Sequence, residues 1–356
     1  MTSQEKIVQL RNKIDAELKD RVGDNCILVD APYYDNIGDV LIWNGVEDFL
    51  KENGKNLVST HSISTFSFPK LDKNLTILLT GGGNFGDLWR YFQEFRLKAI
   101  QKYPDNRILM FPQSVWYEDE NLIEYDRKIL EAHPRLTLCA RDQWSYDFMK
   151  SHFPKCDIRL VPDMAFFISD DRLEKYRNRS AGRKLFFKRI DKEKTSVTPA
   201  SLGESFDVHD WPTVEKRPKV FWWLGKACGA ANRFQRYGLP VFADLIHNEV
   251  DKFAEWKIKE GLLHIGADFL APYDKIVTTR LHAMILGILL HKEVEYIDNT
   301  TGKLSAFANT WLSDLDFVKA YRNCGNQIND DMNSHTTRNI ITPPQLVINQ
   351  RLKNAA

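Results

Sequence analysis

The sequence has few cysteines, no long apolar run and almost no net charge, and each absence narrows the class of protein. Its five cysteines are scattered, odd in number and without CxxC spacing, which argues against a disulfide framework or a zinc site and favours a reducing compartment. No apolar run reaches the ~20 residues that a membrane-spanning helix needs. Residues 1–20 are polar and amphipathic, unlike a signal peptide. We therefore expect a cytoplasmic protein, with a peripheral contact at the inner face of the membrane left open.

Charge and length exclude further classes. Lys and Arg number 49 against 48 Asp and Glu, a net charge of +1. These interspersed charges give no basic surface of the kind that bulk electrostatic binding of nucleic acid requires. With 43% hydrophobic residues in 356, the chain can build two cores. We expect two domains, no metal, no cofactor and no nucleic-acid partner.

Short buried strands alternate with helical segments along the chain. Cys26–Asp30 is predicted to be a strand, and a polar loop leads from it into a helix over Val40–Lys51. The same order recurs after a strand at Leu75–Thr80. This alternation predicts an α/β fold with parallel sheets covered by helices on both faces. Further strands are predicted at Leu57–Thr60, Arg107–Phe111, Lys184–Phe187 and Val294–Asp298, and from Leu136 and Ile158 onward.

Polar side chains follow these predicted strands, at the point where each strand ends. Parallel strands point their carboxyl ends to the same edge of a sheet, which is where ligands bind in open α/β folds. We therefore expect the polar residues after the strands of the first half to gather at one edge. They are Asn36, Asp39, Asn84, Asp87, Gln113, Ser114, Arg141, Asp142 and Asp163.

The segment 81–87 carries three glycines directly after a buried strand. Gly81, Gly83 and Gly86 fit the spacing GxGxxG. However, this is not the first strand of its domain, and the next strand ends in a Pro-Gln-Ser triplet at 112–114 instead of the acidic residue that would hold a ribose. We expect no dinucleotide site. Two interpretations stay open: the glycines let a ligand approach the backbone, or they only let another element pack closely.

A nearly all-polar stretch divides the chain. Residues 171–183 are predicted to link an N-terminal Rossmann-like domain, 1–170, to a C-terminal one, 184–325. Residues 326–356 are polar and weakly patterned, and we expect a tail that crosses back to the first domain. Residues 241–263 are predicted to form one long helix. Its expected inward face carries Phe242, Leu245, Ile246, Val250, Phe253 and Trp256.

Residues 194–240 lack clean periodicity and interleave aromatic with basic side chains, such as Trp222 and Trp223 with Lys226 and Arg233. One interpretation is an irregular excursion whose aromatic side chains fill a core. The other is a set of aromatic faces for a sugar ring, with basic groups for a diphosphate or an anionic membrane surface. The sequence leaves both open.

The stretch 274–290 combines charge with two buried flanks. Residues 276–279 are β-branched and 283–290 almost wholly apolar, which predicts a buried strand, a turn and a short helix. Arg280 and His282 lie at the turn. An arginine fork there can bind phosphate or carboxylate, and a histidine can move a proton. By itself the pattern is more typical of an arginine paired with a local Asp and a satisfied core histidine.

Seven short motifs occur along the chain in the order Asn36-Ile-Gly-Asp39, Gly81-Gly-Gly-Asn84-x-Gly-Asp87, Pro112-Gln-Ser114, Arg141-Asp142-x-x-Ser145, Pro162-Asp163, Arg189-x-Asp191-x-Glu193 and Thr279-Arg280-Leu-His282-Ala283. In combination they resemble the polysaccharide pyruvyl transferase family, over about residues 25–300. The resemblance implies two Rossmann-like domains facing across a cleft, as in glycosyltransferase-B-like folds. It also implies transfer of pyruvate from phosphoenolpyruvate onto a sugar diol as a cyclic ketal, with release of phosphate and no cofactor.

The resemblance also implies roles for residues. Family donor-binding positions match Arg189, Arg280 and His282, which places phosphoenolpyruvate on the second domain and the acceptor on the first. Addition of a sugar hydroxyl needs an acid and a base; His282 is the leading candidate, with Asp39 and Asp87 as candidates from the opposite domain. Further substrate contacts are expected at Asn36, Gly82, Gly83, Asn84, Gln113 and Ser114.

The expected product is a pyruvylated galactose- or hexosamine-type unit of a bacterial capsule or exopolysaccharide, on a lipid- or nucleotide-linked glycan. The principal alternative is a nucleotide-sugar-dependent glycosyltransferase of the same two-domain architecture. A third hypothesis is a protein that binds a glycan or an anion without turnover.

Overall fold

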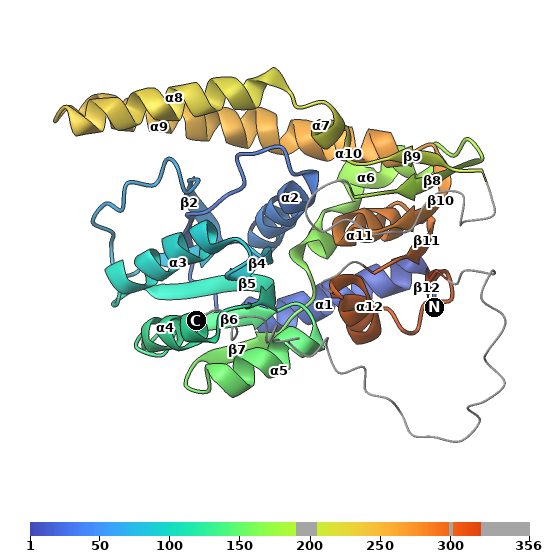
Figure 1. The fold of residues 1–356 in the computed structure, drawn as a ribbon, viewed down its shortest axis with the longest axis horizontal. Helices are drawn as coiled ribbons and strands as arrows, with labels where there is room; N and C mark the ends of the chain where they lie inside the picture. Colours follow the sequence, from blue (N-terminus) through green and yellow to red (C-terminus); the bar gives the residue numbers. More distant parts are fainter. Residues whose placement is uncertain (190–204, 299–301, 322–356) are drawn as a thin grey trace, which may run out of the picture.

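The computed structural model describes residues 1–189, 205–298 and 302–321. Over these residues the chain forms two β-sheets, one of seven strands and one of five, with helices packed around both (Figure 1). Every pairing between described strands is parallel. The predicted α/β class with two parallel sheets is confirmed.

The first sheet has the order β2-β1-β3-β5-β6-β7, with β4 beside β5. Because its central strands are covered on both faces, β3 and β6 are buried along their whole length. The strands are β1 (Asn25–Leu28), β2 (Asn56–Thr60), β3 (Thr76–Leu79), β4 (Gly82–Gly86), β5 (Arg107–Trp116), β6 (Leu136–Ala140) and β7 (Asp157–Leu160). The helices of this half are α1 (Ser3–Leu18), α2 (Ile37–Glu52), α3 (Arg90–Lys102), α4 (Glu120–Leu130) and α5 (Gln143–His152), and a 3₁₀ turn, η1, covers Met164–Phe167.

The glycine segment is itself a strand, β4, and β5 does not end at the Pro-Gln-Ser triplet as predicted but continues through it. Glycine makes this pairing feasible, because a Cβ on Gly81 would lie 2.6 Å from the Pro112 carbonyl oxygen and one on Gly86 only 1.9 Å from that of Trp116. Gly86 also has φ +112°, which disfavours other residues. Close packing of two backbones therefore accounts for these two glycines.

The second sheet has the order β12-β11-β10-β8-β9. Strand β10 pairs with β8. Arg189 follows β8 and Arg280 follows β10, so the two arginines come after neighbouring strands of the same sheet, as predicted. The predicted tail 326–356 lies outside the described residues. The strands are β8 (Arg183–Phe187), β9 (Asp207–His209), β10 (Tyr273–Thr278), β11 (Glu293–Tyr296) and β12 (Val318–Ala320). The helices are α6 (Asp170–Arg177), α7 (Pro212–Glu215), α8 (Lys219–Arg236), α9 (Pro240–Phe253), α10 (Glu260–Leu270), α11 (Leu281–Leu289) and α12 (Lys303–Trp311), with a π-helical stretch, η3, at Ala254–Lys259.

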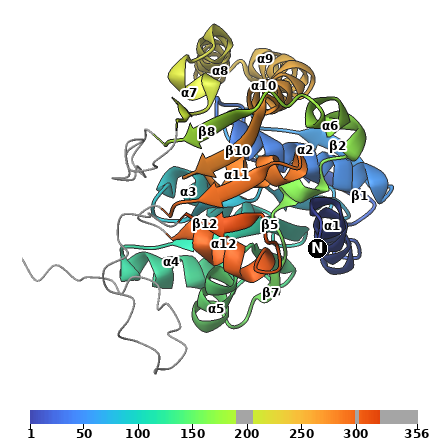
Figure 2. The ribbon, with the colours of Figure 1, turned by 90° about the vertical axis from the view of Figure 1, so that its right-hand side faces the viewer.

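The middle of the chain differs from two of the sequence-based interpretations. The supposed irregular excursion contains the 18-residue helix α8, which pairs with α9 as a hairpin along the top of Figure 1. The predicted long helix is present, since α9, η3 and α10 continue into one another over residues 240–270. Its expected inward face was wrong, because four of the six residues assigned to it are exposed: Phe242, Leu245, Phe253 and Trp256. Both views show α8 and α9 side by side along the outside of the molecule, and the exposed residues of the pair are consistent with that position (Figure 1 and Figure 2).

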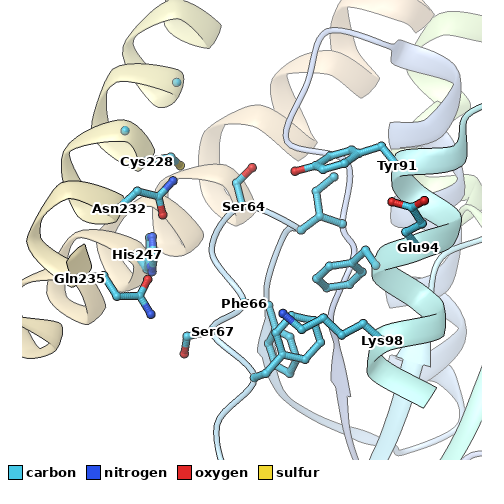
Figure 3. Close-up of a pocket in the computed structure, with 15 residues that line it drawn as sticks. Ser64, Phe66, Ser67, Tyr91, Glu94, Lys98, Cys228, Asn232, Gln235 and His247 are labelled. Carbon is cyan, nitrogen blue, oxygen red and sulfur yellow. The ribbon is translucent and has the colours of Figure 1, made fainter. Parts of the chain in front are cut away.

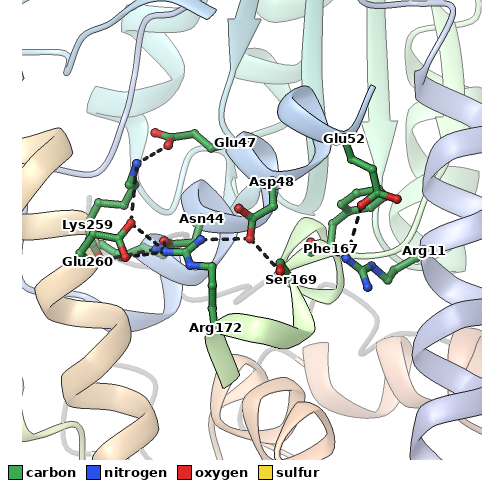
Figure 4. Close-up of polar contacts among 11 residues, drawn as sticks. Arg11, Asn44, Glu47, Asp48, Glu52, Phe167, Ser169, Arg172, Lys259 and Glu260 are labelled. Carbon is green, nitrogen blue, oxygen red and sulfur yellow. Dashed lines mark hydrogen bonds and ion pairs between the residues drawn. The ribbon is translucent and has the colours of Figure 1, made fainter. Parts of the chain in front are cut away.

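The polar stretch predicted as a linker contains helix α6, which sits between the two sheets. Arg172 of α6 donates to Asp48 Oδ2 on α2 at 3.0 Å and to Glu260 Oε1 on α10 at 2.8 Å (Figure 4). Lys259 pairs with Glu47 in the same region. A single hydrophobic core runs beneath, containing residues of both halves such as Trp43 and Leu286. The polar composition of 171–183 thus reflects an ion-paired junction.

Candidate functional site

The first polar group lies at the start of α2. Asn36 caps the helix, its Oδ1 accepting from the Gly38 amide at 3.0 Å, while its Nδ2 donates to Asp39 Oδ2 at 2.7 Å. The Tyr34 hydroxyl donates to the same carboxylate oxygen at 2.9 Å. Burial and the adjacent Asp39 carboxylate raise the pKa of Tyr34 well above its usual value, so the tyrosine stays a donor. Asp39 is thereby held in one orientation.

His282 comes from the second half and meets this group. It lies in the first turn of α11, is 9% exposed, and packs on Gly38. A Cβ at position 38 would lie 2.5 Å from His282 Nδ1, so only glycine leaves room for the ring. Nε2 of the histidine lies 3.4 Å from Asp163 Oδ2, a charge contact without hydrogen-bond geometry. The two halves of the molecule therefore meet at a histidine placed between α2 and the end of β7.

Asp163 is the end of a buried polar chain. Its Oδ2 accepts from Arg141 Nη1 at 3.0 Å, Arg141 Nε donates to Ser114 Oγ at 2.8 Å, and Ser114 donates to Asp142 Oδ2 at 2.7 Å. Burial alone would raise the pKa of Asp163, but His282 and Arg141 together lower it to about 2. The carboxylate is therefore ionised at neutral pH and can orient and stabilise a protonated His282.

Two cations approach the backbone of β4. A Cβ on Gly83 would lie 3.1 Å from Arg141 Nη2 and 3.3 Å from Lys303 Nζ, and one on Gly82 would lie 3.7 Å from Asp39 Oδ1. Lys303 belongs to α12 of the second half and is 9% exposed. Gly82 and Gly83 thus lie between Asp39 on one side and two positive charges on the other.

Three predicted residues are held by neighbours at this edge of the sheet. Asn84 Oδ1 accepts from Arg96 Nη1 at 2.8 Å, and Gln113 Nε2 donates to the Thr80 carbonyl at 2.6 Å. Asp87 Oδ2 accepts from the backbone amides of Glu118 and Asp119, at 2.6 and 2.8 Å. The Asp87 carboxylate thus orders the loop before α4, and its contacts connect it to none of the residues around His282.

The two predicted donor-binding arginines lie side by side at the ends of β8 and β10. The Arg189 amide donates to Thr279 Oγ1 at 2.9 Å. Arg280 is 7% exposed and binds Asp210 with two of its nitrogens, Nη2 to Oδ2 at 2.7 Å. Arg280 therefore does pair with an aspartate, as one interpretation of the sequence held, but the partner lies 70 residues away and is not a local one. The remaining residues of the Arg-x-Asp-x-Glu motif, Asp191 and Glu193, lie outside the described residues.

The structure brings together Asn36, Asp39, Ser114, Arg141, Asp142 and Asp163, all of which the parallel-sheet argument placed at one edge. Gly82, Gly83 and, from the second half, His282 join them there. Members of the cluster that were not among the predicted substrate contacts include Asp163, Arg141 and Lys303. The sequence did contain a signal for Arg141, because this residue directly follows a predicted strand. Lys303 had none, because nothing in the sequence places the start of α12 against β4.

The contact between Gly38 and His282 gives a first prediction. Gly38→Ala should push the imidazole away from Asp163 and lower kcat by roughly 100-fold, the usual effect of about 1 Å of misplacement. Steady-state kinetics of the folded variant measure this. Gly261→Ala on α10 is the matched control, because a Cβ there meets no atom within 4 Å; equal activity of the two variants would contradict the placement of His282.

The ionised Asp163 gives a second prediction. Because its folded pKa is lowered, to about 2, its stabilisation is present above about pH 4 and is lost as pH falls from there toward 2. The free energy of unfolding of the native protein should exceed that of Asp163→Asn by an extra pH-dependent amount of about 2 kcal/mol near neutrality. Urea titrations at several pH values measure the difference, and a gap that stays constant down to pH 2 would refute the assignment.

A cavity of about 640 Å³ lies between α8, α3 and the segment before β3 (Figure 3), and none of the residues around His282 lines it. Aromatic side chains such as Phe66 and Tyr91 line it together with polar ones such as Asn232. His247 also lines it, is 5% exposed, and has both ring nitrogens without a hydrogen-bond partner. Next to Tyr91 on α3, Phe92 packs on Tyr34, which holds Asp39, so one wall of the cavity continues to the Asp39 side of the site.

Two features are absent from the described part of the chain. Across 1–189, 205–298 and 302–321, no three or more His, Cys, Asp or Glu side chains are grouped so as to hold a metal ion. No described helix combines the length and apolar character needed to cross a bilayer.

Comparison with known proteins identifies relatives along most of the chain. A family model described as polysaccharide pyruvyl transferase matches residues 36–300. EpsO of Bacillus subtilis strain 168, which carries the provisional name pyruvyl transferase, is 30% identical over 320 residues, covering 88% of this chain and 93% of EpsO. Pyruvyl transferase 1 of Schizosaccharomyces pombe is 28% identical over 245 residues, covering 65% of this chain and 53% of that protein.

A solved structure shares the fold. The crystal structure of a functionally uncharacterised protein from Klebsiella pneumoniae aligns with a TM-score of 0.57 and 17% identity, over 88% of this chain and 99% of the other. At this identity the likeness shows the fold alone.

Proposed function

Because this chain belongs to the polysaccharide pyruvyl transferase family, a family of transferase enzymes, we propose that it moves pyruvate from phosphoenolpyruvate onto two hydroxyls of a sugar. The single observation that carries the proposal is the meeting of His282 with Gly38, Asp39 and Asp163 between the two halves. The two sheets would then face each other in a glycosyltransferase-B-like arrangement, with the reaction where they meet.

The reaction balances without a redox partner or a cofactor. A proton adds to C3 of phosphoenolpyruvate, and one sugar hydroxyl adds to C2. The second hydroxyl then replaces the phosphate at C2, so two C–O bonds form and the bond from C2 to the phosphate oxygen breaks. The two sugar hydroxyls release two protons. One equals the proton that C3 takes up to become a methyl group, and the other leaves with phosphate. The enzyme must therefore bind an anion, deliver a proton and accept another.

The residues suit these three tasks. His282 delivers the proton, with Asp163 holding its ring and stabilising the charged form. Asp39 accepts the hydroxyl proton from the opposite side, since Asn36 and Tyr34 bind only one of its oxygens. Arg189 and Arg280 bind the anionic groups of phosphoenolpyruvate, with Arg141 and Lys303 completing the positive surface at Gly83. Because Asp87 binds two backbone amides, we give it a positioning role.

We place the acceptor in the cavity beside α3. Aromatic rings with interspersed amides and hydroxyls are suited to sugar rings, and His247 offers two unpartnered nitrogens. The acceptor would be a galactose- or hexosamine-type unit of a bacterial surface polysaccharide, such as a capsule or exopolysaccharide. A lipid-linked glycan would bring the enzyme to the inner face of the cytoplasmic membrane, and a nucleotide-linked one would leave it in the cytoplasm.

A third prediction tests the cavity. His247→Leu removes both ring nitrogens at similar volume and should raise KM for the glycan about tenfold, the cost of one or two lost hydrogen bonds. KM for phosphoenolpyruvate should not change. Initial rates with each substrate varied in turn measure both constants. If KM for phosphoenolpyruvate rose and KM for the glycan did not, the placement of the acceptor would be contradicted.

The proposal is tested by incubating the purified chain with phosphoenolpyruvate and a panel of galactose- and hexosamine-containing glycans. Phosphate release that requires both substrates supports it. A nucleotide-sugar-dependent glycosyltransferase would instead release nucleoside diphosphate from a sugar donor, and a binding protein would release neither.

A further inference from the structure

The α8–α9 hairpin exposes apolar side chains at an unusual density. Of the 18 large hydrophobic residues exposed on the described chain, ten lie between 222 and 256. Six of these form a tip patch around the turn that joins the helices: Phe234, Tyr237, Leu239, Val241, Phe242 and Leu245. Tyr237 is 80% exposed and Val241 68%. Contiguous exposed apolar surface of this kind is uncommon on monomers and marks a contact.

Helix α8 and the turn after it are basic, whereas the rest of α9 carries Asp244, Glu249 and Asp251. Between residues 216 and 243 there are six Lys and Arg and no Asp or Glu, although the whole chain carries only +1. Arg217 pairs with Asp35 at 2.8 Å. The other five, Lys216, Lys219, Lys226, Arg233 and Arg236, are all exposed and form no salt bridge with the described residues. The positive charge is therefore local and largely uncompensated.

The aromatic and basic groups also lie close to each other. Trp222 and Trp223 are exposed on α8, and Lys226 stands over the Trp222 ring at 5.2 Å from its centroid. Tryptophan and tyrosine beside Lys and Arg are the residues that proteins place at the level of lipid headgroups. In Figure 1 the hairpin reaches out past the body of the molecule, so its tip can meet a flat surface without obstruction by the sheets.

A second copy of the chain suits this surface less well than a bilayer. In a two-fold dimer the same patch faces itself, so the unpaired cations of each hairpin would meet those of its partner. Anionic phospholipids neutralise the same charges, each worth about 1 kcal/mol near the membrane surface. We propose that the α8–α9 hairpin docks the protein onto an anionic lipid bilayer, with the tip patch in the acyl boundary and the basic side chains among the headgroup phosphates.

The test uses the full chain without substrates, so that its outcome is separate from that of the transferase assay. Flotation with vesicles of equal parts phosphatidylglycerol and phosphatidylcholine should show binding that weakens as salt is raised. Pure phosphatidylcholine vesicles should bind far less. No binding to the anionic vesicles, or equal binding to both kinds, would overturn the proposal.

Two variants separate the electrostatic part of vesicle binding from the apolar part. The triple change Lys226→Gln, Arg233→Gln, Arg236→Gln should lower binding to anionic vesicles about a hundredfold, and the pair Tyr237→Ser, Phe242→Ser should abolish the part that persists at high salt. The matched control on α4 is Tyr125→Ser with Arg127→Gln and Lys128→Gln, which also removes an exposed ring and two exposed basic groups. This control should bind like the native chain; equal losses in the hairpin and control variants would contradict the assignment.

Analytical sedimentation tests whether a second copy of the chain, and not a bilayer, covers the tip patch. The account expects no self-association that depends on the tip patch. A dimer that Tyr237→Ser, Phe242→Ser converts to a monomer would show that a second copy covers the patch, and would overturn the membrane assignment.

Discussion

His282→Gln is expected to lower kcat by about 100- to 10,000-fold, the usual contribution of a general acid or base. Glutamine can keep a polar contact with Asp163 but has no proton to transfer. The ring it replaces lies between Gly38 and the Asp163 carboxylate, held on both sides. The loss should therefore appear in kcat with a smaller change in KM for phosphoenolpyruvate.

The kinetic pattern separates two roles for His282. A histidine that only holds the phosphate would raise KM for phosphoenolpyruvate and leave kcat near normal. The matched control is His133→Gln, since His133 is also buried but binds the Tyr103 carbonyl in the first half, away from the cluster. Unchanged turnover of His282→Gln would refute the acid–base assignment.

Arg280→Lys is expected to lower kcat/KM for phosphoenolpyruvate by roughly 10- to 100-fold, the cost of losing a charge-assisted, bidentate donor. The lysine keeps a positive charge beside the buried Asp210 carboxylate. Arg280→Ala would remove both hydrogen bonds that this guanidinium donates to the buried Asp210 carboxylate and cost about 3–5 kcal/mol of stability, so the lysine variant is the informative one.

The control for this variant is Arg172→Lys at the junction between the halves. Arg172 is also partly buried and binds two carboxylates, Asp48 and Glu260, but it lies outside the cluster. It should lose stability without losing kcat/KM. Thermal unfolding beside kinetics measures both effects. Normal kcat/KM in folded Arg280→Lys would show that Arg280 serves only to hold Asp210.

The sequence predicted the sheets and the edge at which the polar residues gather. Strand–helix alternation is a local signal, and parallel pairing then brings Asp39, Gly83 and Ser114 to the same end of the sheet. Contacts between the halves carry no such signal. The placement of Lys303 at Gly83 and of His282 on Gly38 depends on how two independently patterned units pack.

The hairpin shows the limit of the apolar-inside assumption. Phe242, Leu245 and Trp256 were assigned to a core because they recur at helical spacing, yet they face outward. Spacing identifies the apolar side of a helix but not what that side contacts. A bilayer, a partner or a core gives the same pattern.

The central claim is the transfer of pyruvate at the site where the two halves meet, and its most direct test is mass spectrometry of the glycan after incubation with phosphoenolpyruvate. The account predicts a product heavier than the acceptor by one pyruvic acid less one water, formed together with one phosphate and strongly reduced in His282→Gln. An unchanged glycan across the panel, or a product extended by a sugar from a nucleotide donor, would contradict it.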